Sequence, residues 1–482
     1  MPEDKLKMIK DLGINPYPDT VPKPLAIEKL VNNFDKLIKQ QKKVWLGGRV
    51  MSLREHGKIT FLNLKDFSGK VQIIIKAELI PNYEQFLKII DIGDIVLFYG
   101  EAFLTKTKEK SLLASKWCLG AKVLKNFSNE YYKVKDEELL LRHPYLRTIF
   151  YDETKTVFYH RFKLLESLRK ILWQEGFLEV ETPILQLKYG GALAKPFVTY
   201  LESLKEKLYL RIAPEISLKK MLVGGFEKIF EIGKNFRNEG IDREHNPEFT
   251  MIELYWAYQN LEGLMRFTEK ILKKLIKQYN QWRGQNNLAI NFNNYVIDLD
   301  KKWQRYEYIS LFKEITGLDY FHNSLQDFIN FASKNDIHLN PKVMNKGKIA
   351  DEIFKKKIRP QLVQPTFLLY HPKDISPLAK AHPQNDNLTL RFQLYLGGFE
   401  IANAFAELND PLDQKERFEK EARVLRKGDA EAHPFDETFI EALEFAMPPA
   451  AGLGIGLDRL FTILLNKKNI QDIIYFPFMR NK

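Results

Sequence analysis

The chain has 482 residues, too many for a single hydrophobic core, so two or three domains are expected, and its 45% hydrophobic content excludes a disordered chain. The formal net charge of +12 favours a polyanionic partner, unless it reflects only a compositional bias toward lysine. The single Cys118 excludes a disulfide framework and favours a reducing compartment, which we expect to be the cytoplasm, and no apolar run is long enough to span a membrane.

The N-terminal part of the chain predicts a helical extension followed by a small barrel. Residues 1–43 begin with several prolines and continue into the helical pattern LAIEKLVNNFDKLIKQQ. Residues 44–125 contain five short strand patterns, separated by turn signals such as Ser68-Gly69. Five short strands predict a closed barrel, and the OB-fold is its common nucleic-acid-binding form. Residues 126–153 are predicted to be a linker.

The last domain is expected over residues 154–482, and it opens with an amphipathic helix that runs from about Thr154 to Gly176. The apolar stripe of this helix consists of Phe158, Phe162, Leu165, Leu168, Ile171 and Leu172. The following segment, FLEVETPIL at 177–185, is predicted to be a strand. A helix over 261–280 then begins a mixed insertion that reaches about residue 365.

A hairpin is predicted over residues 236–256, FRNEGIDREHNPEFTMIELYW. On an extended strand, Phe249, Met251, Glu253 and Tyr255 share one face, while the residues between them form an apolar face. A carboxylate and a phenol are unusual on a strand that faces only a core. The sequence therefore predicts a cleft along this face.

The connection within this hairpin crowds charged side chains into a turn-rich segment. Arg237 and Glu239 share a face just before it, and His245 lies inside it. Arginine and histidine beside the aromatic ring of Phe249 are suited to an anionic ligand that carries a ring, and a nucleotide is the obvious candidate.

The segment GGFEIANAFAELND, residues 397–410, places Asn403, Phe405 and Glu407 on one strand face, with Glu400 just before them. Paired glycines ahead of such a strand permit close approach of a ligand. An exposed edge strand with scattered polar side chains is the alternative interpretation.

The segment AGLGIGLDRLFTILL, residues 451–465, alternates glycine with apolar residues, so one side of the strand is bare and something must pass close to it. Arg459 follows in the first turn of a helix, where the helix dipole and the guanidinium both favour phosphate. The glycine spacing matches neither the dinucleotide fingerprint nor a P-loop. A nucleotide would therefore be held by arginines on a different scaffold.

These segments together resemble the class II aminoacyl-tRNA synthetases, and most closely the lysyl-tRNA synthetase family. GFLEVETPIL resembles motif one of the class, FRNEGIDREHNPEFTMIELYWAY motif two, and GLGIGLDRL motif three. GGALAKPFVT, LRIAPEISLK, QPTFLLYHPKDISPLAK and GGFEIANAFAELND match the lysine-specific pattern. The resemblance implies an α+β fold, with a catalytic domain built on an antiparallel sheet flanked by helices and an N-terminal OB-fold β-barrel. It also implies a homodimer that forms through motif one.

The resemblance assigns residues to ATP and to a metal ion. Arg237 and Arg459 would be the catalytic arginines, with Arg237 on the α-phosphate and Arg459 at the far end of a bent ATP. Adenine would lie between Phe249 and Arg459, and Mg²⁺, with its preference for oxygen ligands, would be held by Glu400. Gln393 occupies the position of the usual second metal-ligating glutamate, which leaves the number of Mg²⁺ ions open. The ATP-binding residues implied are Arg237, Glu239, His245, Asn246, Phe249, Glu400 and Arg459.

The resemblance also implies residues that bind L-lysine. These are Gly190, Ala213, Glu215, Glu253, Tyr255, Asn403, Phe405 and Glu407. A buried ammonium requires carboxylate partners, so an acidic pocket suits lysine and should reject neutral amino acids. Ornithine lacks one methylene, which offers only ~1–3 kcal/mol of discrimination. A salt bridge inside a strand pair is the alternative role for Glu253.

The barrel would read the anticodon of tRNA(Lys) through Arg49, Phe61, Gln72 and Glu109. An aromatic side chain on an OB strand can stack on a base, although Phe61 would also suit the core of the barrel. The expected function is ATP-dependent activation of L-lysine and its transfer to tRNA. Two alternatives are a paralogue that passes the aminoacyl-adenylate to another acceptor, and a catalytically inactive nucleic-acid-binding protein.

Overall fold

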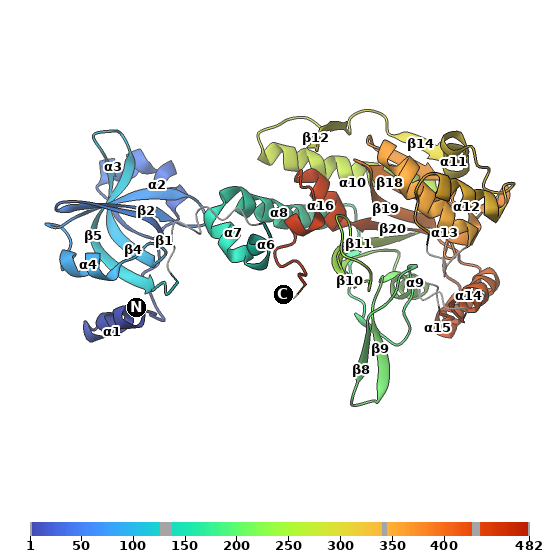
Figure 1. Cartoon of the computed structure of the whole chain (residues 1–482), viewed down its shortest axis with the longest axis horizontal. Coiled ribbons are helices and arrows are strands. Elements are labelled where there is room, and N and C mark those ends of the chain that lie inside the picture. The colour runs from blue at the N-terminus through green and yellow to red at the C-terminus, as the bar shows by residue number, and fades with distance from the viewer. Residues whose placement is uncertain (1, 126–136, 340–344, 427–433, 481–482) are drawn as a thin grey trace. The chain divides into compact units, whose positions relative to one another are not determined.

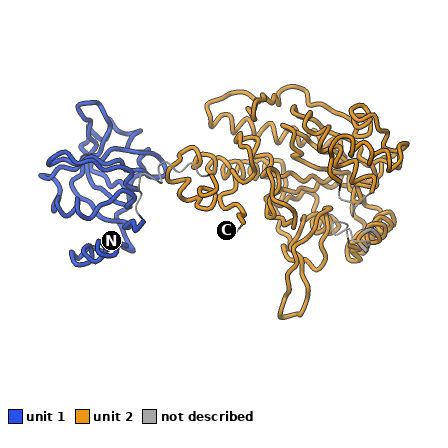
Figure 2. The backbone as a smooth tube through the Cα atoms, in the orientation of Figure 1, with its two compact units in different colours: residues 1–136 blue, residues 137–482 orange. Residues whose placement is uncertain are grey.

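A computed structural model describes residues 2–125, 137–339, 345–426 and 434–480. Figure 2 shows that the chain divides into two compact units, Met1–Asp136 and Glu137–Lys482. Of the segment predicted to be a linker, residues 126–136 lie outside the described ranges. Within those ranges, no helix combines the length and the hydropathy needed to cross a lipid bilayer.

The first unit contains the predicted closed barrel, with strand order β1-β2-β3-β5-β4. Its strands are β1 (Lys43–His56), β2 (Ile59–Lys65), β3 (Lys70–Lys76), β4 (Ile95–Leu104) and β5 (Lys110–Ala121). Alternate side chains such as Leu62 and Leu64 fill the interior. The N-terminal helices α1 (Pro2–Asp11), α2 (Ile27–Asn32) and α3 (Phe34–Gln40) add apolar residues to this core, and α4 (Tyr83–Ile89), which the sequence did not predict, lies between β3 and β4.

The second unit is built on an eight-stranded sheet, shown in Figure 1, with the order β14-β15-β18-β19-β20-β11-β10-β6. The strands are β14 (Gln304–Glu307), β15 (Thr366–Leu369), β18 (Arg391–Leu396), β19 (Phe399–Ala406), β20 (Ala450–Gly456), β11 (Glu248–Ala257), β10 (Lys228–Phe236) and β6 (Leu178–Glu179). Neighbouring strands are antiparallel except at the two ends, where β14 runs parallel to β15 and β6 runs parallel to β10. The predicted α+β fold is confirmed.

Three helices form the main core of this unit together with the sheet: α8 (Asp152–Gln174), α10 (Leu261–Trp282) and α16 (Leu457–Leu464). The helix predicted from about Thr154 is α8, and Gly176 follows it with a φ of 82°, the left-handed conformation that glycine adopts readily after a helix. The shorter helices of the unit are α6 (Glu137–Arg142), α7 (Pro144–Phe150), α9 (Glu215–Val223), α14 (Pro411–Arg426) and α15 (Glu437–Glu444).

The helices of the insertion after α10 pack in a core of their own, whereas its first two strands pack in the main core of the unit. The elements of the insertion are β12 (Ala289–Phe292), β13 (Tyr295–Asp298), α11 (Tyr308–Thr316), α12 (Leu325–Lys334), α13 (Lys346–Ile353), η1 (Phe354–Ile358) and η2 (Arg359–Gln361). Elsewhere in the unit lie β7 (Leu185–Gln186), β8 (Val198–Leu201), β9 (Glu206–Leu210), η3 (Lys373–Ile375), β16 (Ala381–His382), β17 (Asn385–Thr389) and η4 (Ile470–Ile473). Figure 1 shows the β8–β9 hairpin projecting from the body of the unit.

Two local predictions were wrong. The strand predicted over 177–185 is only two short strands, β6 and β7, because β6 pairs with β10 through just two residues before the chain departs toward Pro183. Phe162 belongs to the predicted apolar stripe of α8, yet its exposed fraction is 56%. The buried stripe runs instead through Val157, Leu164 and Leu168 and their neighbours.

Candidate active site

A cleft in the second unit lies along the β10–β11 hairpin, strands β19 and β20, and the first turn of α16. Twelve of the predicted site residues line it: Glu215, Arg237, Glu239, His245, Asn246, Phe249, Glu253, Tyr255, Glu400, Asn403, Phe405 and Arg459. Four do not: Gly190, Ala213, Gln393 and Glu407. The neighbouring Gly191 lines the cleft where Gly190 was expected, and Ala213 is buried beside it. The structure therefore gathers most of the predicted site, while the role of each residue stays a prediction.

The alternation predicted for β11 is present. Met251, Glu253 and Tyr255 face the cleft, whereas Ile252 and Leu254 are fully buried on the other face of the sheet. Strand β20 pairs with β11 on this surface, and the bare side of its glycines accommodates side chains of the protein itself. A Cβ atom on Gly452 would lie 2.2 Å from Glu407 Oε1 and 2.5 Å from Tyr255 Cε1. The glycine thus permits the acidic side chains to approach the strand.

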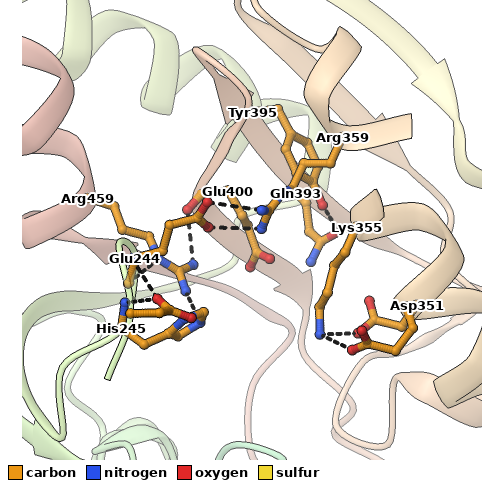
Figure 3. Close-up of polar contacts among 11 residues, drawn as sticks. Glu244, His245, Asp351, Lys355, Arg359, Gln393, Tyr395, Glu400 and Arg459 are labelled. Atoms are coloured by element: carbon orange, nitrogen blue, oxygen red, sulfur yellow. Dashed lines mark hydrogen bonds and ion pairs between the residues drawn. The ribbon is translucent and has the colours of Figure 1, made fainter. Parts of the chain in front are cut away.

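At one end of the cleft, here called the arginine half, Arg237, Glu244, His245, Glu400 and Arg459 come together. Arg459 Nη2 lies 2.9 Å from His245 Nε2, and His245 Nδ1 lies 2.9 Å from Asp242. Because a guanidinium can only donate, His245 Nε2 accepts and Nδ1 carries the proton. The loop between β10 and β11 is therefore tied to the first turn of α16, as Figure 3 shows.

Arg237 follows directly on β10, and its backbone N–H donates to Pro247 across the hairpin. Its guanidinium carbon lies 5.0 Å from the centre of the Phe249 ring, close enough for a cation–π contact. The Nε of Arg237 is buried without a hydrogen-bond partner among the described residues. Burial lowers the pKa of this guanidinium, and the nearby Glu239 opposes the shift. A partly exposed arginine whose buried Nε donor is unused is well placed to bind an anion in the cleft.

The side chains fit one carboxylate-held metal ion and do not fit a second. Glu400 lines the cleft, and its carboxylate oxygens accept no hydrogen bond from the described residues. Gln393 lies outside the cleft, and its Oε1 accepts from His371 Nε2 at 2.8 Å and from the Tyr395 hydroxyl at 2.9 Å. Both lone pairs of this oxygen are therefore used. In the described parts of the chain, no three His, Cys, Asp or Glu side chains gather as metal ligands, so a metal at Glu400 would take further oxygens from its substrate or water.

A third arginine, Arg359, lies beside the arginine half of the cleft. Arg359, at the start of η2, contacts both carboxylate oxygens of Glu244 at 3.0 Å, and Figure 3 shows this pair next to Arg459. The contact ties the end of the insertion to the loop of the β10–β11 hairpin.

Burial lowers the pKa of His371 well below its usual value, so the group that holds Gln393 is a neutral imidazole.

At the other end of the cleft, here called the acidic half, two almost fully buried carboxylates line the cleft, and a third, Glu407, lies behind Gly452. The exposed fractions are 4% for Glu215, 4% for Glu253 and 1% for Glu407. The Tyr255 hydroxyl donates to Glu253 at 3.1 Å. Burial, together with the charge of the neighbouring Glu215, raises the pKa of Glu253 to about 8. Carboxylates kept at this cost are typical of a site that binds a cation.

Sequence reasoning missed three residues that hold this site together. Lys219 pairs with Glu215 and Glu407, and its position four residues after Glu215 on a helix was the available signal. Arg391 donates to Asn403 at 2.9 Å and to the backbone of Ile375 at 2.8 Å. Asp458 accepts from the Thr250 backbone at 2.7 Å and pairs with Arg161, which fixes α16 against β11 and α8.

The predicted anticodon residues lie on the barrel of the first unit. Arg49, Phe61 and Gln72 come from β1, β2 and β3, and the strand register places them on the outer face of these strands. Phe61 is half-buried and lies outside the core of the barrel, while Glu109 is exposed in the turn between β4 and β5. The Gln72 side chain accepts from the Ser111 hydroxyl at 3.0 Å. Strands two and three of an OB-fold are its usual nucleic-acid-binding face.

The sequence of the second unit matches a protein family through most of its length. The family model described as tRNA synthetases class II (D, K and N) matches residues 136–480. The chain belongs to this family. A second model, for the OB-fold nucleic acid binding domain, matches residues 44–118 of this class II synthetase.

Curated relatives of this class II synthetase extend the match to the whole chain. A lysine–tRNA ligase of Fervidobacterium nodosum is 41% identical over 98% of this chain and 92% of its own length. Proteins of the same name from Carboxydothermus hydrogenoformans and Thermotoga maritima are 41% and 40% identical over 96% of their lengths. The resemblance to the class II synthetases is confirmed.

Proposed function

We propose that the chain is a lysine–tRNA ligase. It would activate L-lysine with ATP to lysyl-adenylate and pyrophosphate, and then transfer lysine to the 3′ end of tRNA(Lys). The observation that carries this proposal is the division of one cleft into an arginine half and an acidic half. The names and the 40% identity of the relatives support it. A cytoplasmic location, expected from the single Cys118, belongs to the same proposal.

In the first step, a carboxylate oxygen of lysine attacks the α-phosphorus of ATP, and pyrophosphate leaves. Arg237 of the arginine half also acts on Glu253 of the acidic half, so a guanidinium between the two substrates would stabilise the charge that develops on the α-phosphate. Arg459 would hold the phosphates at the far end of ATP, and Phe249 would stack on adenine. A Mg²⁺ ion held by Glu400, when bound, would neutralise phosphate charge. Positioning and charge neutralisation suffice, and no covalent enzyme intermediate is needed.

Lysine would bind with its two ammonium groups among the buried carboxylates. Glu253 and Tyr255 would face the ε-ammonium, and Glu215 would face the α-ammonium. Asn403 and Phe405 line the space between, and Glu407 lies beneath it, behind Gly452. A neutral amino acid would leave buried carboxylates unpaired, which costs several kcal/mol.

Amino-acid-dependent ATP–pyrophosphate exchange tests the activation step. We expect exchange with lysine, weaker exchange with ornithine, and none with the neutral amino acids, aspartate or asparagine. Ornithine is the demanding control because it lacks only one methylene. If lysine supports no exchange, or another amino acid supports it better, the proposed substrate is wrong.

The second step would use the barrel to select tRNA. Three of the four predicted anticodon residues share the outer face of β1, β2 and β3, which supports this role. Replacing Phe61 with alanine should raise the KM for tRNA about tenfold, through the loss of ~1–3 kcal/mol of stacking, and leave pyrophosphate exchange unchanged. Leu62, on the opposite face of β2, provides a structural comparison. Equal charging of transcripts with a normal and an altered anticodon would contradict the proposal.

Two alternatives remain distinguishable. A paralogue that passes the adenylate to another acceptor would exchange pyrophosphate but would not charge tRNA, and the complete barrel of the first unit argues against it. A catalytically inactive binding protein would bind tRNA without exchange. The presence of Arg237, Glu400 and Arg459 in one cleft argues against that second alternative.

We also infer a homodimer that forms through α8 and the segment after it. Phe162 and Trp173 on α8 are 56% and 53% exposed, and a groove runs between them past Leu165. Exposed aromatic residues in such a groove are typical of a protein–protein interface. Sedimentation equilibrium should give a dimer for the unaltered chain and a monomer for F162E. A monomeric unaltered chain would refute this assignment.

A further inference from the structure

A lysine side chain lies buried in the protein beside the acidic half of the cleft. Lys219 is fully buried on α9, with its Nζ 2.7 Å from Glu215 Oε1 and 2.5 Å from Glu407 Oε2. The aromatic rings of Phe405 and Phe439 lie 6.0 Å from the same nitrogen. An ammonium so far from water is stable only because it has carboxylate partners and ring faces around it.

The two carboxylate partners of Lys219 lie far apart from each other in the sequence. Glu215 lies one turn earlier on α9, whereas Glu407 follows β19 and its backbone N–H donates to Ala450. Lys219 thus joins α9, whose Glu215 lines the cleft, to the residue that directly follows the central strand β19. Arg391 on β18 acts on Glu215 and Arg237 acts on Glu253, whereas the pKa of Glu407, which burial raises, is lowered by Lys219. Lys219 is the cation that pairs with Glu407.

Lys219 contributes to the charge balance of this half through direct contact. Three buried carboxylates, Glu215, Glu253 and Glu407, carry three negative charges when all are ionised. Arg391 acts on Glu215 and Arg237 on Glu253 from beyond ion-pair distance, whereas Lys219 contacts both Glu215 and Glu407. The proposed substrate would bring two ammonium groups to this cluster, and Lys219 supplies a further positive charge within it. A buried site in which every charge is paired is far less costly than one with a single charge left over.

We propose that Lys219 is a positioning residue for lysine specificity, which holds Glu215 and Glu407 aligned and leaves a site that fits a ligand with two ammonium groups. This inference rests on the proposed lysine activation. It assigns to Lys219 no contact with the reacting atoms. Its effect is on the affinity for the amino acid and on the pH at which that affinity appears.

The ionisation of the surrounding groups agrees with this role. Burial opposes the charged form of Lys219, but the fields of Glu215 and Glu407 outweigh it and hold the pKa of Lys219 above its usual value. Burial raises the pKa of Glu407, and Lys219 counteracts that shift. Removing Lys219 would therefore raise the pKa of Glu407 further and leave the site protonated at neutral pH.

The experiment compares K219M with K220M in lysine-dependent pyrophosphate exchange. Lys220 is the matched control because it is the next residue on α9 and its Nζ contacts Thr438 outside the cleft. We expect K219M to raise the KM for lysine at least 30-fold at pH 7, with kcat changed only a few-fold. The acidic limb of kcat/KM against pH should move upward by at least one unit. K220M should behave like the unaltered chain.

Chemical rescue separates charge from packing. K219A opens space for a small amine, so added propylammonium should restore part of the affinity for lysine, while propanol, of the same size but neutral, should not. If propanol restores as much as propylammonium, or if K219M keeps an unaltered KM and pH profile, the assignment is wrong. Absence of exchange in the unaltered chain would instead refute the proposed function. Thermal melting of each variant identifies any that fail to fold.

Discussion

The two halves of the cleft hold their charged side chains in opposite ways. In the arginine half, the charged groups pair with one another across different segments: Arg459 with His245, and Arg359 with Glu244. These groups keep partial exposure, and their partners can be exchanged for a ligand. In the acidic half, Glu253 and Glu407 are buried, and burial raises the pKa of each to about 8.

The difference follows from what each substrate brings. A triphosphate arrives with several negative charges and metal ions, so the protein needs only arginines in the right places. A small cation such as lysine must be distinguished from other amino acids, and this requires counter-charges that are already buried when it binds. The arginine half should therefore control the rate, and the acidic half should control the affinity for the amino acid.

The largest effect is expected at Arg237, where the halves meet. R237A should lower kcat for pyrophosphate exchange by ~10³-fold or more, because it removes the guanidinium that faces the developing charge on the α-phosphate. The KM for lysine should change little. R243A is the control, since Arg243 lies in the same loop but contacts the Phe399 ring and the Lys468 backbone instead. If R237A mainly raises the KM for lysine and leaves kcat nearly unchanged, the arginine half does not control the rate as proposed.

A smaller effect, this time on affinity, is expected at Glu253. E253Q should raise the KM for lysine about 10²-fold, because one ammonium then lacks its carboxylate, with a smaller change in kcat. E248Q is the control on the same strand, where Glu248 pairs with Lys234 at the surface. An unchanged KM in E253Q would return Glu253 to the alternative role of a structural carboxylate.

E253Q should also stabilise the free protein. The pKa of Glu253 is about 8 in the folded protein and about 4.3 in the unfolded chain. As the pH rises between these values, the carboxyl ionises more readily in the unfolded chain, so Glu253 increasingly destabilises the folded protein. The melting temperature of E253Q minus that of the unaltered chain should therefore increase from pH 5 to pH 8. A constant difference would show that Glu253 does not titrate in this range.

The fold was predictable wherever the signal was local. Alternation along β11 and the glycines of β20 are patterns within a single strand, and both led to the right faces. The strand expected at 177–185 failed because its extent depends on how much of β10 is available for pairing. The seven-residue helix α4 was missed because so short an element carries little periodicity.

The sequence predicted most of the residues that form the site, but it did not predict which of their side chains contact one another. Sequence placed Glu215 and Glu407 together through a resemblance, but it gave no sign that Lys219 lies between them. The partners are almost two hundred positions apart in numbering, and only the folded chain brings them into contact. Likewise, the resemblance left open whether Gln393 takes part in metal binding, and only the structure shows that His371 and Tyr395 hold it outside the cleft.

The affinity for lysine should depend on pH in the acidic half alone. Because burial raises the pKa of Glu253 and of Glu407 to about 8, part of the free site is protonated at pH 7, and lysine binds the ionised form. The Kd for lysine should therefore fall about tenfold from pH 6.5 to 8.5, with release of protons on binding. Calorimetry in buffers of different ionisation enthalpy measures this release. If the affinity for ATP changes with pH by the same factor as the affinity for lysine, the two halves do not differ in their dependence on pH.

The smallest effect concerns the number of metal ions in the arginine half. Gln393 Oε1 already accepts two hydrogen bonds and offers no charge, so Glu400 alone should anchor Mg²⁺ there. Q393E should add one bound Mn²⁺ per chain, counted by electron paramagnetic resonance with a non-hydrolysable ATP analogue, and change the exchange rate only a few-fold. E400Q should remove one ion from the unaltered count. If Q393E binds no additional ion, the amide at this position does not limit the metal content, and the charge of the arginine half is set by its arginines alone.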